Sequence, residues 1–218
     1  MSTALPNRLP PASWREWSSL IQLCEALGAQ EGTARFVGGA VRDCLLGIGV
    51  KDIDIATTHL PQDVVRRVKA AGFKAVPTGI EHGTITAVLD GSPVEITTLR
   101  RDVSTDGRRA MVAFGTDWRG DAGRGDFTMN ALYADPTDGT LHDYFGGLAD
   151  LADHRVRFIG APHARIAEDY LRILRYFRFT ARFGTLDRHS PEYAACVVRA
   201  TSLMALSREG IAGEFLGP

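Results

Sequence analysis

Residues 35–55 constrain the fold of this 218-residue chain more than any other stretch, because two short motifs lie together there. The first motif predicts a buried strand that ends at Val37, and the pair Gly38 and Gly39 then predicts a tight turn. Apolar spacing after the turn predicts a short helix that ends at Gly47. Backbone amides at the start of a helix attract anions, so this turn indicates a phosphate-binding site.

The second motif places two carboxylates beside that turn. A strand is predicted at residues 53–56, with Asp54 in it and Asp52 just before it. Side chains two residues apart on a strand point the same way, so both aspartates face one spot. Arg42, in the short helix, adds a guanidinium suited to phosphate. Two aspartates repel unless a cation lies between them, and Mg²⁺ prefers carboxylate and phosphate oxygens. The sequence therefore predicts a magnesium site at Asp52 and Asp54.

Composition limits the partners and the compartment. The chain is 44% hydrophobic and 23% charged with a formal net charge of −1, so it can form a core, and any contact with nucleic acid must be local. Its three cysteines are far apart in apolar contexts without zinc spacing, which is typical of reduced core residues in a cytoplasmic protein. No leader and no long apolar run is found, so neither export nor a membrane span is predicted.

A hairpin in the middle of the chain carries a third carboxylate. Alternating apolar residues predict strands at residues 84–89 and 94–98, joined through residues 90–93. Glu95 lies between two apolar residues of the second strand, so its side chain faces away from theirs. Glu95 is either a third carboxylate beside the aspartate pair or a solvent-facing residue on an edge strand.

The second half of the chain is first polar and then helical. Residues 99–125 lack apolar periodicity, which is typical of a functional loop or a disordered segment. A helix is predicted from Asp126, with its side chain as the cap. One long helix is predicted from about Ala164 to Arg182. Its predicted core side comprises Leu171, Leu174, Phe177 and Ala181. The same predicted helix carries a stripe of charged side chains, which are Glu168, Asp169, Arg172, Arg175, Arg178 and Arg182. Taken alone, such a stripe indicates a solvated face with weak ion pairs.

Together these motifs resemble the head and neck domains of the class II tRNA nucleotidyltransferase and poly(A) polymerase family. The resemblance lies in six segments: Val-Gly-Gly-Ala-Val-Arg-Asp at 37–43, Lys-Asp-Ile-Asp-Ile-Ala-Thr at 51–57, Val-Glu-Ile-Thr-Thr at 94–98, Asp-Phe-Thr-Met-Asn-Ala-Leu at 126–132, Glu-Asp-x-x-Arg-x-x-Arg-x-x-Arg-Phe at 168–179, and Leu-Ser-Arg-Glu-Gly-Ile at 206–211. It covers nearly the whole chain. Two positions depart from it, because Gly125 and Gly210 stand where the family has arginine.

The resemblance implies an α+β fold, in which a nucleotidyltransferase-type mixed sheet flanked by helices is followed by an all-helical neck. The catalytic head is expected at residues 1–160 and the nucleotide-selecting neck at residues 161–218. Family members continue into body and tail domains that grip tRNA, and residues 1–218 are not expected to supply them.

The resemblance also implies a reaction: an RNA 3′-hydroxyl attacks the α-phosphate of CTP or ATP, and pyrophosphate leaves. Two Mg²⁺ ions at Asp52 and Asp54 would activate the hydroxyl and neutralise the triphosphate, with Glu95 as the third catalytic carboxylate. The nucleotide-binding residues implied are Gly38, Gly39, Arg42, Asp126, Asn130, Asp169, Arg172, Arg175 and Arg178. The expected partners are ATP, CTP and the tRNA 3′ end or another RNA, without a membrane.

Asp169 and Arg172 are expected to select the base. If both lie on one helix, three residues apart, their side chains are neighbours. Aspartate offers acceptors and arginine offers donors, a pattern that fits the amino and ring-nitrogen edge of cytosine and of adenine. Uracil and guanine present the opposite pattern.

Two alternatives remain open. A poly(A) polymerase shares every motif above. A catalytically weak fragment that binds nucleotide or RNA fits the glycines at 125 and 210 and the missing body domain. The sequence indicates no oligomeric state.

Overall fold

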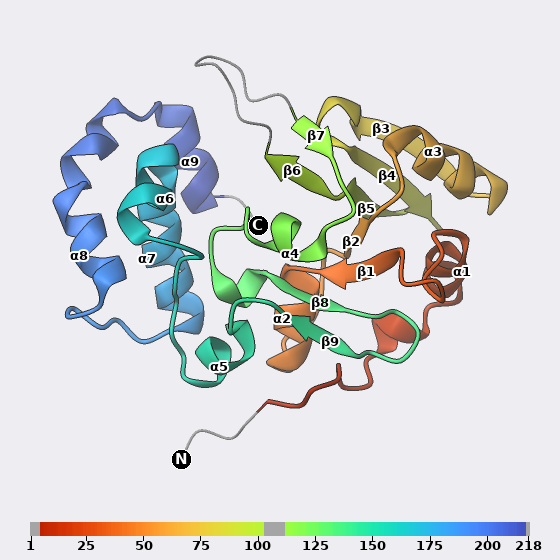
Figure 1. Ribbon diagram of the computed structural model, residues 1–218, viewed down its shortest axis with the longest axis horizontal. Helices are drawn as coiled ribbons and strands as arrows, with labels where there is room; N and C mark the ends of the chain where they lie inside the picture. The colour runs from red at the N-terminus through yellow and green to blue at the C-terminus, as the bar shows by residue number, and fades with distance from the viewer. Residues whose placement is uncertain (1–4, 103–111, 217–218) are drawn as a thin grey trace. The chain divides into compact units, whose positions relative to one another are not determined.

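The structure, a computed structural model, describes residues 5–102 and 112–216 and divides into two compact units (Figure 1). We call residues 6–122 and 130–144 the sheet unit. The described residues of the other unit, here the helical unit, are 5, 123–129 and 145–216. A mixed sheet with flanking helices confirms the predicted α+β class. The head and neck division at residue 160 stays a prediction, and the structure groups residues 145–160 with the helices that follow them.

A seven-stranded sheet forms the centre of the sheet unit, in the order β3-β4-β5-β2-β1-β8-β9. Its strands β2 and β5 pair in parallel, and its other neighbours are antiparallel. The bounds are β1 Ala34–Val37, β2 Asp54–Thr57, β3 Lys74–Gly79, β4 Thr84–Leu89, β5 Ser92–Thr98, β8 Leu132–Ala134 and β9 Leu141–Asp143. A separate ribbon consists of β6 Arg100–Asp102 and β7 Val112–Phe114.

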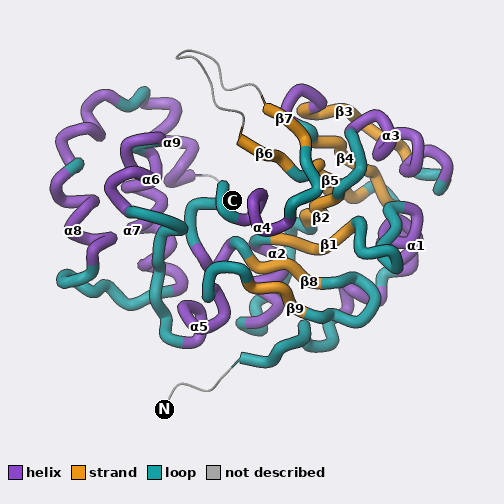
Figure 2. Tube along the Cα trace, in the orientation of Figure 1, coloured by secondary structure: helices purple, strands orange, loops and turns teal. Residues whose placement is uncertain are grey.

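The helices of the sheet unit are short (Figure 2). They are η1 Ser13–Glu16, α1 Ser18–Ala26, α2 Gly39–Leu45, α3 Pro61–Ala70, η2 Ile80–His82 and α4 Trp118–Ala122. Helix α3 places Val64 and Val68 in the core, both with no exposed surface. These two positions are one turn apart, which is the spacing of an apolar helix face.

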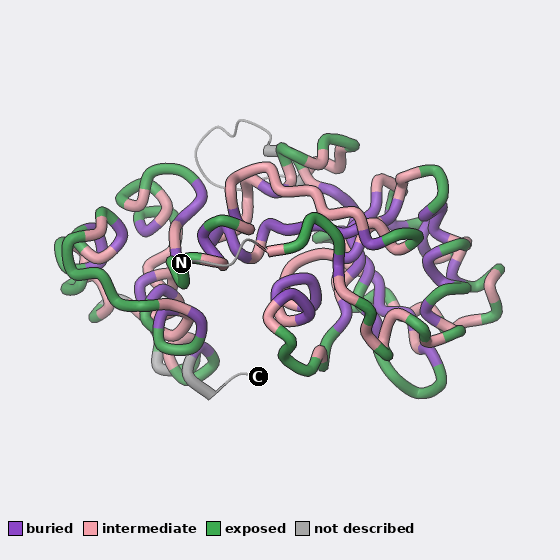
Figure 3. The backbone as a smooth tube through the Cα atoms, turned by 90° about the horizontal axis from the view of Figure 1, so that it is seen from below, coloured by how far each residue is buried: buried purple, intermediate pink, exposed green. Residues whose placement is uncertain are grey.

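The two faces of the sheet differ because side chains alternate along each strand. One row of register partners runs across four strands through Ile85, Ile96, Ile55 and Phe36, and every one of them is buried. Figure 3 colours the backbone by burial and shows buried segments in the interior of the sheet unit. The neighbouring row, on the opposite face, includes Glu95 and Asp54. Burial of the apolar row stabilises the sheet, and it fixes the strand register that presents the two carboxylates together.

The helical unit consists of α5 Gly147–Ala152, α6 Pro162–Glu168, α7 Leu171–Phe183, α8 Pro191–Val198, η4 Ala200–Ala205 and α9 Arg208–Leu216. Helix α7 buries Ile173, Tyr176, Thr180 and Phe183. The Phe158 ring stacks on Tyr176, with centroids 5.9 Å apart. The core of this unit therefore combines stacked aromatic rings with aliphatic side chains such as Ile166 and Ile173.

The predicted long helix from Ala164 to Arg182 is wrong. Asp169 has φ −154° and ψ 112°, which is extended backbone, so the segment forms two helices, α6 and α7. The predicted core side is wrong as well, since Phe177 is 38% exposed and Ala181 is exposed. The break allows each helix to turn its own apolar side inward.

The predicted helix from Asp126 is also wrong. Residues Thr128–Asn130 (η3) form a single 3-10 turn, and strand β8 begins at Leu132. The Asp126 side chain binds arginines of α7 instead of capping a helix.

The predicted hairpin is confirmed and is tighter than expected. Leu89 pairs directly with Ser92, so only Asp90 and Gly91 form the turn, both with positive φ. A two-residue turn of this kind matches the strand twist.

The loop predicted at residues 99–125 contains β6, β7 and α4, and its residues 103–111 lie outside the described structure. All three cysteines are free and buried. Across the described residues, every helix is too short or too polar to cross a membrane.

Candidate active site

The carboxylates Asp54 and Glu95 are register partners on neighbouring parallel strands, β2 and β5. Partners of this kind share a face of the sheet, so the two side chains lie on the same side. Asp52, two residues earlier, is exposed. Glu95 is exposed but does not lie on an edge, because β5 pairs with β4 on one side and β2 on the other. The structure thus places Glu95 beside Asp54. The predicted alternative is wrong about the edge strand, although Glu95 does face solvent.

The electrostatic surroundings of Asp54 favour a bound cation. Burial, and then the negative charges of Glu95 and Asp52, raise the pKa of Asp54 to about 6. Each of these causes makes the ionised form of Asp54 costly in the absence of a counter-charge. A cation beside this carboxylate would remove much of that cost.

The donor set is compatible with magnesium. In the described part of the chain, no group of three or more His, Cys, Asp and Glu side chains is arranged to hold a metal ion. Mg²⁺ is usually bound through one or two carboxylates, and waters and substrate phosphates complete its shell. Asp52 and Asp54 therefore supply as many carboxylates as Mg²⁺ usually takes from a protein, and of the kind it prefers.

The turn before α2 depends on Gly38, which has φ 73° and ψ −129°. Residues with a Cβ atom rarely adopt a positive φ, so glycine is needed at this position. The Gly38 amide donates to the carbonyl of Leu132, which joins the turn to β8. Gly39 is the first residue of α2. Phosphate binding at this turn stays a prediction.

Arg42 is buried, and protein groups hold its guanidinium. Its Nε and Nη2 contact Asp43 Oδ1 at 2.8 and 2.7 Å, and its Nη1 donates to Asn130 Oδ1. With a side chain only 8% exposed, Arg42 ties α2 to the turn at Asn130. For both residues, binding to a nucleotide stays a prediction.

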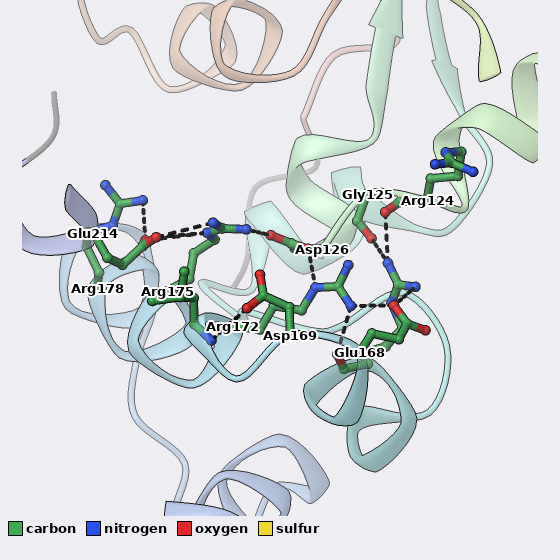
Figure 4. Close-up of polar contacts among 11 residues, drawn as sticks. Arg124, Gly125, Asp126, Glu168, Asp169, Arg172, Arg175, Arg178 and Glu214 are labelled. Atoms are coloured by element: carbon green, nitrogen blue, oxygen red, sulfur yellow. Dashed lines mark hydrogen bonds and ion pairs between the residues drawn. The ribbon is translucent and has the colours of Figure 1, made fainter. Parts of the chain in front are cut away.

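In the helical unit, Asp126 lies between two arginines of α7 (Figure 4). Arg172 Nε donates to Asp126 Oδ1 at 2.5 Å, and Arg175 Nη1 donates to Asp126 Oδ2. Arg172 Nη1 also donates to Glu168 Oε2 and to the carbonyl of Arg165, at 2.5 and 2.7 Å. Three predicted site residues, Asp126, Arg172 and Arg175, therefore form one charged cluster.

Asp169 lies outside this cluster. Its Oδ1 accepts a hydrogen bond from the amide of Leu171 at 2.9 Å, in the break between α6 and α7. The prediction that Asp169 and Arg172 are neighbours on one helix face is wrong, because Asp169 is not helical and the Arg172 guanidinium binds Asp126 and Glu168. Selection of the base by this pair stays a prediction.

Gly125 stands where the family has arginine, and Arg165 contacts the backbone there. Arg165 Nη2 donates to the carbonyl oxygens of Arg124 and Gly125, both at 2.8 Å, and its Nη1 contacts Glu168 at 2.7 Å. These bonds fasten the segment before Asp126 to α6. They use backbone oxygens, so they do not depend on the side chain at position 125.

Sequence reasoning missed two residues of this cluster, Arg165 and Glu214. Arg165 belongs to α6, and Glu214 of α9 binds Arg175 and Arg178. The contacts of Glu214 depend on how α9 packs on α7, and no local spacing in the sequence indicates them. Arg165 lies three residues before Glu168 on α6, a spacing that could have indicated their ion pair.

The chain resembles proteins of known activity. The model of the Poly A polymerase head domain matches residues 34–157. The human protein named CCA tRNA nucleotidyltransferase 1, mitochondrial, is 46% identical over 199 residues, which are 89% of this chain and 44% of the relative. The structure of the Bacillus stearothermophilus CCA-adding enzyme in complex with CTP is 35% identical with a TM-score of 0.76, covering 91% of this chain and 47% of that one.

Another solved structure, a tRNA nucleotidyltransferase complexed with a primer tRNA and an incoming ATP analog, is 29% identical with a TM-score of 0.69. This chain covers 54% of that protein, and 90% of this chain is matched. The chain thus spans about half the length of the proteins it matches.

Proposed function

The chain belongs to the poly(A) polymerase head-domain family, and on this premise we propose that it transfers CMP and AMP from CTP and ATP to an RNA 3′ end, as in CCA addition to tRNA. One observation carries the proposal: Asp54 and Glu95 are paired on one face of the sheet, with Asp52 two residues away. The similarity to proteins whose structures hold CTP, or tRNA with an ATP analog, supports these substrates.

The carboxylates supply the chemistry of the sheet unit. Nucleotidyltransferases of this family generally use a divalent metal, and we propose Mg²⁺ held by Asp52 and Asp54, which would offset the negative charge on the reacting phosphate. Glu95 adds a negative charge to the same face, which helps raise the pKa of Asp54 and increases the attraction of this face for a cation. The RNA 3′-hydroxyl attacks the α-phosphorus, and pyrophosphate leaves.

The turn and the arginines supply binding. The Gly38 amide is bonded to the carbonyl of Leu132, so the amides that begin α2, from Gly39 onward, would receive the triphosphate. Arg42 and Asn130 hold this turn in place. In the helical unit, the guanidinium groups of α7 provide charge-assisted donors for the nucleotide. Asp126 orients two of them.

Incorporation of labelled nucleotides tests this function. The chain is incubated with Mg²⁺ and a tRNA that ends at the discriminator base, together with labelled CTP and ATP. Incorporation of CMP and AMP is expected. AMP alone would favour A-addition or poly(A) polymerase activity, and no incorporation with retained binding of CTP would favour a nucleotide-binding fragment. A cytoplasmic location stays a prediction, since the human relative is named as mitochondrial.

Asp169→Ala tests base selection. If Asp169 accepts from the amino group of cytosine or adenine, its loss should reduce the preference for CTP and ATP over UTP and GTP about tenfold or more, because an unpaired polar group in a buried site costs about 1–3 kcal/mol. Competition among all four nucleoside triphosphates measures this preference. Asp187→Ala, in an exposed turn of the same unit, is the control. Selection as strict as that of the unmodified chain would contradict the role.

Gly125→Arg tests the departure from the family. Restoring a guanidinium should tighten binding of CTP and ATP about tenfold, since a hydrogen bond to a charged group contributes roughly 1.5–3 kcal/mol. Isothermal titration calorimetry measures the two dissociation constants, with Gly125→Ala as the control for the loss of glycine. Equal affinities for the arginine and alanine variants would show that another residue already makes this contact.

A further inference from the structure

We propose that Glu214 of α9 is a positioning residue, which holds Arg175 and Arg178 in the conformation that binds a nucleoside triphosphate. This inference rests on the proposed function, in which α7 contributes arginines to nucleotide binding. Glu214 would act through the two arginines without touching the nucleotide itself.

The contacts of Glu214 support this role. Arg178 Nη2 lies 2.6 Å from Glu214 Oε1, and Arg175 approaches Oε2 with Nη2 at 3.2 Å and Nε at 3.3 Å. One carboxylate is therefore shared by two guanidinium groups that lie three residues apart on α7 (Figure 4). Without that charge between them, the two cations would repel each other and turn toward solvent.

Solvent exposure differs between Glu214 and the two arginines that it binds. The Glu214 side chain is 7% exposed, whereas the side chains of Arg175 and Arg178 are 29% and 33% exposed. An arginine carries five N–H donors, and the contacts of Arg175 with Asp126 and Glu214 use one hydrogen on each of its three nitrogens. One donor thus remains on each terminal nitrogen of a side chain that is partly exposed, and a phosphate could accept from them.

Asp126 and Glu214 hold Arg175 from two sides. Asp126 binds its Nη1, and Glu214 binds its Nε and Nη2. A guanidinium held by two carboxylates loses little freedom when a ligand binds, so less entropy opposes binding. Arg178 has Glu214 as its carboxylate partner in the described structure, and it should depend on Glu214 more strongly than Arg175 does.

The opposite role has a different signature. If Glu214 instead competed with the phosphates for the arginines, removing its charge would free them and tighten binding. Positioning predicts weaker binding. The sign of the change in affinity therefore separates the two roles.

The experiment measures the dissociation constant of CTP, with Mg²⁺, and the thermal midpoint for each variant. Glu214→Gln keeps the shape of the side chain and removes its charge, and it should weaken CTP binding about tenfold, the loss expected for one charge-assisted contact. Glu214→Asp keeps the charge and should recover most of that loss. Glu209→Gln, an exposed glutamate on the same helix, is the matched control and should bind CTP as the unmodified chain does.

A second measurement separates positioning from a purely structural role. In a chain that already carries Arg175→Ala and Arg178→Ala, adding Glu214→Gln should not weaken CTP binding further, because the groups it positions are gone. A further loss there would overturn the proposal. If Glu214→Gln is unfolded at the assay temperature, Glu214→Asp decides: it should bind CTP more weakly than the Glu209→Gln control and more tightly than the double arginine variant.

The outcomes also separate this proposal from the proposed function. If the unmodified chain binds CTP and Glu214→Gln binds it equally well or more tightly, the positioning role alone is overturned. No CTP binding by the unmodified chain overturns both.

Discussion

Asp54→Asn should abolish nucleotide transfer while making the metal-free protein more stable. A bound metal contributes several kcal/mol to the stabilisation of such a transition state, so the rate of CMP incorporation should fall about a thousandfold or more. The stability gain follows from the raised pKa of Asp54, about 6, because the asparagine removes a charge that burial, Glu95 and Asp52 all disfavour.

The pH dependence of that gain has a defined sign. Because the pKa of Asp54 is higher in the folded chain than in the unfolded chain, the folded state binds more protons in the window between about 4 and 6. The unmodified protein therefore loses stability as pH rises through this window, and the full cost is present above about pH 6. A shift of about two units corresponds to about 3 kcal/mol as an upper figure.

Thermal unfolding in EDTA measures this effect. The midpoint of Asp54→Asn should exceed that of the unmodified chain by about 5–10 °C at pH 7.5, with little difference below pH 4. Glu81→Gln, an exposed residue of the same unit, should change neither stability nor transfer. Transfer by Asp54→Asn at a rate near that of the unmodified chain would remove Asp54 from the catalytic site.

Asp150→Asn should produce a large loss of stability in the helical unit. Asp150 has no exposed surface and accepts from Thr128 at 2.6 Å, from Arg157 at 2.8 Å and from Arg155 at 2.6 Å. Removing one partner of a buried charged network leaves the others unpaired. Since the two arginines are 54% and 38% exposed, solvent reduces the cost, and we expect about 2–4 kcal/mol.

Chemical unfolding in urea measures the loss directly. Asp153→Asn, an exposed position at the end of the same helix, is the matched control and should change stability by less than about 0.5 kcal/mol. A change for Asp150→Asn as small as that of the control would show that solvent or other side chains replace the lost contacts.

Parts of the site with a local origin could be predicted from the sequence. The glycine turn before α2 was expected from the Gly38-Gly39 pair, and Gly38 indeed has a positive φ. The hairpin was predicted as well, although its turn consists of Asp90 and Gly91 alone and the prediction had four residues there. Alternation within a strand was enough to place Glu95 on the face opposite its apolar neighbours. These features depend on residues that are near in the sequence, because backbone steric limits and the alternation of side chains along a strand act over a few residues.

Contacts between distant segments could not be predicted in this way. Asp126 has the sequence context of a helix cap, yet it binds Arg172 and Arg175, which follow it by more than forty residues. The periodicity of residues 164–182 fits one helix, yet the chain breaks at Asp169, whose carboxylate accepts from the Leu171 amide. A capping bond or one more helical turn contributes about 1 kcal/mol, and tertiary burial of an apolar face outweighs it.

The sequence by itself determined which groups are candidates for the chemistry, because residue types and their spacing along single strands and turns indicate the carboxylates, the glycine turn and the arginines. Tertiary structure alone decided the partners of these groups. The parallel pairing of β2 with β5 brings Glu95 opposite Asp54, and the packing of α9 on α7 brings Glu214 to Arg175 and Arg178. The physical reason is that such contacts arise when separate apolar faces are buried together, a non-directional force that leaves no local pattern in the chain.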